Sequence, residues 1–125
     1  MNFLAIDGTK DKVNFFLYFN NNCFNKFFES SKTNNEKFSI FLFDFLNENN
    51  IKLNQLNHLF INQGPGKFSG IRTSIVVAKA LSISNKLNLY GFNDKDLKNK
   101  DYLSILNLYK KGLLIKNLIK PVYLS

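Results

Sequence analysis

The first thirty residues carry the apolar patterns of three strands. Residues 1–7 form a nearly continuous apolar run, which is typical of a buried strand. Apolar positions recur at every second residue over Val13–Phe19 and again over Cys23–Glu29, and three asparagines at 20–22 separate the two runs. This pattern predicts two more strands joined by a turn. We therefore expect a meander of three antiparallel strands.

A helix and a fourth strand are predicted next. Thr33–Glu36 has the form of a capping box, so a helix should begin near Asn34 and stop around Asn49. Helical spacing puts one apolar set on the face expected to pack on the sheet: Phe38, Phe41, Leu42, Phe45 and Leu46. Ile40 and Phe43 point the other way. A connector then leads to a strand at His58–Asn62, whose histidine we interpret as structural.

The segment after residue 68 predicts a helix that is apolar nearly all round. Ser69 is its expected N-cap, and Arg72 and Lys79 form a narrow polar edge. The apolar positions occupy almost every direction around the axis: Ile71, Ile75, Val76, Val77, Ala78, Ala80, Leu81 and Ile83. A chain this small has little left to cover the face turned away from the sheet. We therefore expect the outward side of this helix to form an exposed apolar patch with Ile40 and Phe43. A protein partner should cover that patch.

The C-terminal third predicts a strand and a last helix. Leu87–Phe92 reads as a fifth strand, and a helix should start at Asn93–Asp96 and run to about Lys111, with Gly112 just past its end. A final segment follows at Pro121–Leu124. The fold class expected is α/β, with a mixed five-stranded sheet in the order βββαβαβ followed by a C-terminal helix.

Length and composition favour one globular domain over residues 1–125. The chain is 45% hydrophobic, and neither a membrane span nor a signal-peptide pattern is present, so we expect a cytoplasmic protein that does not contact membranes. A single cysteine, Cys23, excludes an internal disulfide and suits a reducing compartment.

The net charge of +8 permits a nucleic-acid interpretation. No acidic residue occurs between Glu48 and Asp94, and a basic field of this kind would steer an RNA or an acidic partner. The alternative is an ordinary solvated surface, because all but one of the basic residues are lysine. The exception, Arg72, lies inside a glycine-rich motif, where its planar five-donor group suggests a specific role.

That motif is Gly64–Arg72, with the sequence Gly-Pro-Gly-Lys-Phe-Ser-Gly-Ile-Arg. Its glycine spacing does not fit the dinucleotide fingerprint, and Ile71 stands where a phosphate-binding loop needs lysine. An ordinary strand-to-helix turn and a turn whose amides touch a phosphate both remain open.

Catalytic and cofactor chemistry find little support in the sequence. Asp7, at the end of the first strand, is either an Asx-turn or an acid that meets phosphate, and Asp7 and Gly66 are the weak candidates for cofactor binding. One histidine, His58, does not make a paired-histidine metal site, and no nucleophile–base constellation is evident. We expect no metal, no cofactor and no enzyme activity.

Three motifs in order resemble the TsaB (YeaZ) family. The glycine motif is similar to that family's Gly-Pro-Gly-x-Phe-Ser/Thr-Gly-Ile/Leu-Arg signature, and residues 1–7 resemble its first strand, which ends in Ala-Ile-Asp. The ending Lys120–Ser125 resembles its Pro-Val-Tyr-Leu-Arg close, with Ser125 in place of arginine. The resemblance implies a single ribonuclease-H-like (actin-like) lobe over residues 1–91. Residues 92–125 would be a retained closing helix and tail, with most of the second lobe missing.

The resemblance also implies a function in making threonylcarbamoyladenosine on tRNA. The chain would be a non-catalytic subunit that binds and stabilises or activates a TsaD-like transferase, with a TsaE-like ATPase as a possible further partner and tRNA reached only through the complex. The alternatives are a basic tRNA-binding module and a vestigial nucleotide-binding lobe. A further expectation is a homodimer of the isolated chain. The expected partner-binding residues lie on the two helices and the glycine motif: Phe38, Ile40, Phe43, Gly64, Pro65, Gly66, Phe68, Gly70, Ile71, Arg72, Ile75, Val76, Lys79 and Ile83.

Overall fold

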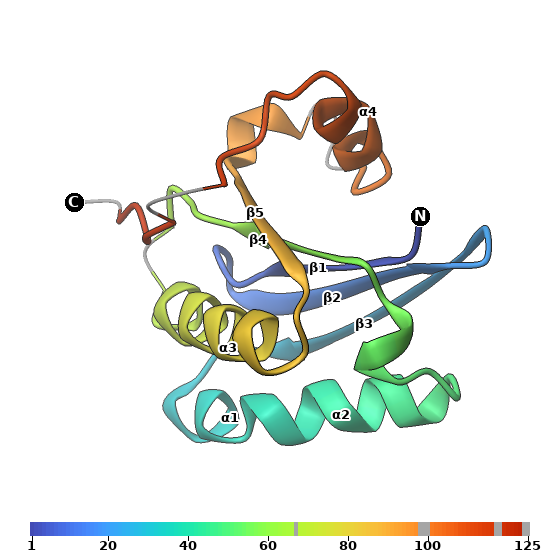
Figure 1. Cartoon of the computed structure of the whole chain (residues 1–125). Coiled ribbons are helices and arrows are strands. Elements are labelled where there is room, and N and C mark those ends of the chain that lie inside the picture. Colours follow the sequence, from blue (N-terminus) through green and yellow to red (C-terminus); the bar gives the residue numbers. More distant parts are fainter. Residues whose placement is uncertain (67, 98–100, 117–118, 124–125) are drawn as a thin grey trace.

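A mixed five-stranded sheet forms the centre of the molecule (Figure 1). The computed structural model describes residues 1–66, 68–97, 101–116 and 119–123. The strands lie in the order β3-β2-β1-β4-β5, with antiparallel pairing among β1, β2 and β3 and parallel pairing of β4 with β1 and β5. Their bounds are β1 Phe3–Asp7, β2 Lys12–Phe19, β3 Asn22–Glu29, β4 His58–Asn62 and β5 Asn88–Phe92. The predicted meander, the mixed sheet and the order of elements are confirmed.

The central strands are apolar because both faces of the sheet are covered. Every residue of β1 and of β4 is buried. At the hairpin between β2 and β3, Asn20 and Asn21 adopt φ values of 49° and 65°, a conformation that asparagine tolerates better than most residues. The asparagine run therefore makes the turn that its composition predicts.

Three helices cover one face of the sheet (Figure 1). They are α1 Lys32–Glu36, α2 Phe38–Glu48 and α3 Gly70–Ser84, and a short 3-10 turn, η1 Leu53–Gln55, precedes β4. The predicted inner face of α2 is confirmed, since Phe38, Leu42, Phe45 and Leu46 are buried and Phe41 packs against them half-buried. These side chains share one core with β1, β2, β4 and α3.

The other face is covered by α4 Ser104–Lys110, which Figure 1 places on the opposite side of the sheet from α2 and α3. A second apolar cluster fills this interface, with Phe3, Phe16 and Phe60 from the strands and Ile105 from α4. His58 belongs to the same layer: its Nε2 lies 3.0 Å from the Tyr109 hydroxyl, and its ring stacks near Phe60 and Tyr90. The structural interpretation of this histidine is confirmed.

The expected continuous helix from Asn93 to Lys111 is wrong. A 3-10 turn, η2 Asp94–Asp96, stands at its start, and α4 begins only at Ser104. The Asp96 side chain accepts the Asn93 N–H at 2.9 Å, and the Asp94 N–H donates to the Gly64 carbonyl at 2.9 Å. These bonds hold the segment in a turn against the glycine motif. Gly112 does end α4 with φ 69°, as predicted, and part of the predicted helix (98–100) and Leu124 of the final segment lie outside the described residues.

Two predicted helix caps are also wrong. Ser31, not the expected capping box at Thr33, caps α1 by accepting the Asn34 N–H at 3.1 Å. Ser69 has helical dihedrals and makes no capping bond. Its hydroxyl instead accepts from Asn35 Nδ2 at 2.8 Å, so it joins α1 to the start of α3.

Among the described residues, no helix is both long enough and apolar enough to cross a membrane. The interpretation of residues 92–125 as the remainder of a shortened second lobe stays a prediction.

Candidate partner-docking surface

Hydrogen bonds of Gly64 and Gly66 join the glycine motif to neighbouring segments of the chain. Gly64 has a φ of 122°, a backbone conformation that would be strained for any residue with a side chain. Its N–H donates to Asn62 Oδ1 at 3.0 Å. The Gly66 N–H donates to the Val122 carbonyl at 3.0 Å, and the Val122 N–H donates to the Gln63 carbonyl at 2.7 Å. The turn therefore fixes the C-terminal segment and η2 against the end of β4.

Close backbone packing explains glycine at two further positions. A Cβ on Gly66 would lie 2.8 Å from the Thr9 carbonyl oxygen, and a Cβ on Gly8 would collide with the Gly70 carbonyl. The loops after β1 and β4 thus meet backbone to backbone at the start of α3. This packing accounts for glycine at positions 8 and 66 without a ligand.

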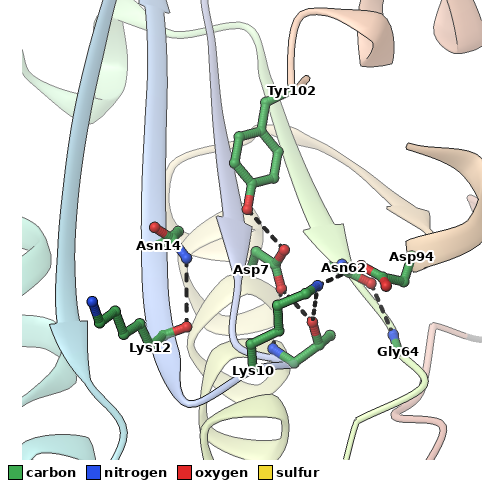
Figure 2. Close-up of polar contacts among 9 residues, drawn as sticks. Asp7, Lys10, Lys12, Asn14, Asn62, Gly64, Asp94 and Tyr102 are labelled. Atoms are coloured by element: carbon green, nitrogen blue, oxygen red, sulfur yellow. Dashed lines mark hydrogen bonds and ion pairs between the residues drawn. The ribbon is translucent and has the colours of Figure 1, made fainter. Parts of the chain in front are cut away.

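Asp7 satisfies its carboxylate within the protein (Figure 2). Its Oδ1 accepts the Thr9 N–H at 3.0 Å and the Thr9 hydroxyl at 2.6 Å, which makes the Asx-turn that the sequence allows. Its Oδ2 accepts the Tyr102 hydroxyl at 2.8 Å. Burial and the neighbouring Asp7 charge raise the pKa of Tyr102, so this hydroxyl stays a hydrogen-bond donor at all ordinary pH values.

A second carboxylate beside this turn is neutralised by a lysine (Figure 2). Lys10 Nζ lies 2.6 Å from Asp94 Oδ1, and Asn62 Nδ2 donates to the same oxygen at 3.5 Å. No group of three or more His, Cys, Asp or Glu side chains within the described segments is placed to hold a metal ion. These contacts link the loop after β1 to β4 and η2. We therefore interpret this group of polar residues as structural.

The outer face of α2 and α3, which we call the α2–α3 face, is apolar and exposed. Ile40 and Phe43 on α2 are 59% and 42% exposed, and Val76 and Ile83 on α3 are 61% and 79% exposed. The exposed apolar patch is therefore where the sequence predicts it. Figure 1 shows the two helices side by side on the same face of the sheet. Their C-terminal ends border a common hollow lined by Phe43 and Leu81, among others.

Two basic residues accompany the apolar ones on α3. Arg72 and Lys79 are exposed, and Arg72 Nε donates to the Tyr123 hydroxyl at 3.3 Å. Pro65 is also exposed and Phe68 is half-buried at the turn that leads into α3. These positions extend the α2–α3 face toward the glycine motif.

Several residues expected to contact a partner lie inside the core instead. Phe38, Ile71 and Ile75 are at most 3% exposed and pack toward the sheet, and Gly64, Gly66 and Gly70 are buried as well. The reason is that α3 is apolar on the sheet side and on the solvent side, so sequence alone does not separate the two. Val76 and Ile83, rather than Ile75, present the outer surface.

Sequence reasoning missed two residues that organise the region. Tyr102 bonds Asp7 across 95 positions of sequence, and nothing in the apolar pattern around it indicates that contact. Asn35, 8% exposed, donates to Ser30 Oγ at 3.2 Å and to Ser69 Oγ. An asparagine inside a predicted first helical turn gave no signal of that role.

Comparisons with known proteins agree with the motifs. A family model described as TsaD, tRNA N6-adenosine threonylcarbamoyltransferase, matches residues 29–96, more than half of the chain. A curated protein named tRNA threonylcarbamoyladenosine biosynthesis protein TsaB, from Buchnera aphidicola subsp. Schizaphis graminum, is 46% identical over 43 residues. That match covers 34% of this chain and 20% of the relative.

Solved structures share the fold. YeaZ from Pseudomonas aeruginosa superposes with a TM-score of 0.70 at 18% identity, over 89% of this chain and 50% of YeaZ. RuvC from T. thermophilus, solved with a Holliday junction substrate, gives a TM-score of 0.54 at 9% identity, over 97% of this chain and 83% of RuvC. The chain thus spans about half the length of the YeaZ structure that it matches. From the family model and the named relative, we conclude that the chain belongs to the TsaB (YeaZ) family.

Proposed function

We propose that this chain is a non-catalytic subunit of a complex that forms threonylcarbamoyladenosine on tRNA, and that it binds and stabilises or activates a TsaD-like transferase in the cytoplasm. The observation that carries the proposal is the α2–α3 face, on which the large apolar residues Ile40, Phe43, Val76 and Ile83 are each more than 40% exposed. Exposed apolar patches of this kind mark protein interaction sites. The names of the family model and of the curated relative supply the reaction.

The absence of a catalytic role is part of the proposal. Asp7 is engaged by Thr9 and Tyr102, and His58 by Tyr109, so neither side chain faces a substrate. A TsaE-like ATPase and tRNA would join through the complex. Without its transferase, the chain would pair with itself through the same apolar face.

The proposal is tested by measuring the affinity of the purified TsaD-like transferase from the same organism for variants of this chain that carry a new charge. Val76→Glu places a carboxylate on the exposed side of α3 and should weaken binding at least about a hundredfold, since an unpaired charge buried in an interface is costly. Leu113→Glu is the matched control, because Leu113 is 62% exposed and follows α4 on the other side of the sheet. Titration calorimetry measures both affinities, and circular dichroism verifies folding. Equal affinity of the two variants would refute docking through α3.

A second candidate function rests on the charges of α3 and its surroundings. Lys52, Arg72, Lys79 and Lys86 are exposed in a stretch without acidic residues. If this stretch binds tRNA directly, the isolated chain should bind tRNA with an affinity that falls steeply with salt. Arg72→Gln and Lys79→Gln would each lower that salt slope by about one. Under the docking proposal, tRNA binding appears only with the transferase present.

A further inference from the structure

One edge of the sheet is paired with another segment of the described chain, and the other edge is not. At the β5 edge, Gly91 exchanges two backbone hydrogen bonds with Ile115, at 2.6 and 3.0 Å. At the β3 edge, no strand of the described chain pairs with the outer side. A free edge of eight residues is a template for strand addition.

The register shows which backbone groups of β3 face outward. In an antiparallel pair of strands, opposite residues alternate between hydrogen-bonded and non-bonded pairs. The Ser30 N–H donates to the Asp11 carbonyl at 2.8 Å, so Ser30 and Asp11 form a bonded pair, and every second residue back along β3 is bonded to β2 as well. The even-numbered residues of β3 therefore bond to β2, and Cys23, Asn25 and Phe27 point their N–H and C=O groups away from the sheet. Next to them, the outward Glu29 carbonyl already accepts Asn34 Nδ2 at 2.8 Å, so that end of the edge is closed.

An aromatic hollow lies between this edge and α2. It has a volume of about 290 Å³ and is lined by Phe15, Lys26, Phe27, Phe28, Phe41, Asp44 and Glu48. The rings of Phe28 and Phe41 lie 4.8 Å apart in its wall. Because an apolar cavity of about 150 Å³ already holds benzene, the hollow has room for one large apolar side chain.

Among the described residues, the charged side chains at the rim of the hollow leave one negative charge unpaired. Lys26 Nζ pairs with Glu48 at 3.2 Å, which neutralises both. Asp44 is exposed and, within the described parts of the chain, forms no ion pair. The remaining charge at the hollow is therefore negative, on a chain whose net charge is +8.

We propose that β3 binds an extended peptide segment of a partner protein by strand addition, with one large apolar side chain in the aromatic hollow and a lysine or arginine two positions away facing Asp44. Side chains two residues apart lie on the same face of a strand, so both anchors point to α2. Backbone bonds to Cys23, Asn25 and Phe27 supply affinity, and the hollow supplies selectivity. This surface is separate from the α2–α3 face and does not depend on its function.

The test uses a fluorescein-labelled peptide, Thr-Lys-Thr-Phe-Thr-Lys-Thr, which places phenylalanine and lysine on one face. Fluorescence anisotropy should show saturable binding that is lost when the phenylalanine is replaced by serine. Asn25→Pro removes an outward N–H without touching the β2 ladder and should weaken binding about tenfold, while Asn25→Thr keeps the N–H and the affinity. Asp44→Asn should weaken binding a few-fold at low salt, whereas Asp101→Asn, on the other side of the sheet, should have no effect.

Three results would overturn the proposal. They are no binding to the unaltered chain, equal binding of the serine peptide, and unchanged affinity of a folded Asn25→Pro variant. If that variant does not fold, a peptide N-methylated at alternate residues replaces it, and undiminished binding of this peptide is equally contradictory. A chain that ignores the peptide but dimerises in sedimentation, and becomes monomeric with Asn25→Pro, would assign the edge to a second copy instead.

Discussion

At the residue scale, one buried carboxylate holds together segments from both ends of the chain. Asp7 on β1 is 2% exposed and binds Thr9 in its own loop and Tyr102 just before α4. A buried carboxylate that loses a hydrogen-bond donor costs more than the bond itself contributes. The contact therefore joins the N-terminal strand to the last helix more strongly than a surface contact would.

We predict that Tyr102→Phe lowers the free energy of unfolding by about 1–3 kcal/mol, because Asp7 Oδ2 stays buried and loses its hydrogen-bond donor. Tyr123→Phe is the control: Tyr123 is 49% exposed and its hydroxyl accepts a hydrogen bond from the exposed Arg72, so its change should stay within about 0.5 kcal/mol. Urea unfolding followed by circular dichroism measures both. A Tyr102→Phe variant as stable as Tyr123→Phe would contradict the assignment.

His58 gives the fold a defined pH dependence. Burial, then the N-terminal ammonium and Lys116, lower the pKa of His58 below its usual 6.5. As the pH falls below about 6.5, the unfolded chain takes up a proton that the folded chain refuses, so stability present at neutral pH is lost toward pH 5.

We predict that His58→Gln removes this loss between pH 7 and pH 5. The measurement is the free energy of unfolding at each pH for the natural chain and the variant, and one histidine contributes a slope of at most about 1.4 kcal/mol per pH unit. Parallel pH profiles of the two proteins would show that the dependence comes from other groups.

At the element scale, strong periodicity made the strands and α2 predictable. The alternation over β2 and β3 and the apolar stripe of α2 each have one geometric solution, and β4 was predicted with its observed bounds. The structure of the segment after β5 was not predictable in this way. Its start is fixed by long-range hydrogen bonds, such as the one from the Asp94 N–H to the Gly64 carbonyl. Local propensity for a helix at Asp94 was overridden by that tertiary contact.

The hairpin between β2 and β3 gives a prediction at this scale. Asn21→Gly should raise the free energy of unfolding by about 0.5–1 kcal/mol, because glycine adopts the observed φ of 65° without strain. Asn22→Gly, one residue later within β3, should lower it by a similar amount, since glycine weakens a strand. Thermal unfolding of both variants measures the difference, and a loss of stability in Asn21→Gly would contradict the turn geometry.

At the scale of the whole molecule, the two faces of the sheet have unequal cover. Aromatic rings from the strands, among them those of Phe3, Phe16, Phe60 and Tyr90, pack with α4 on one side. On the other side α2 and α3 cover the sheet but present apolar residues to solvent. The sequence predicted this outward apolar surface from the all-round apolar pattern of α3. It did not distinguish Ile75, which is buried, from Val76, which is exposed, because that depends on the rotation of the helix on the sheet.

The free edge at β3 was not predictable either, since strand order is a property of the folded sheet rather than of any one segment. The hairpin pattern indicated that β3 pairs with β2 but not that its other side stays open. For the same reason the hollow lined by Phe15, Phe28 and Phe41 emerges only when α2 is placed along that edge.

Hydrogen–deuterium exchange of the chain with and without its TsaD-like transferase tests the central claim most directly. Docking through the α2–α3 face predicts slower exchange over Phe38–Glu48 and Gly70–Ser84 on binding, with Ser104–Lys110 unchanged. Protection confined to α4 and the C-terminal segment, with α2 and α3 unaffected, would contradict the account.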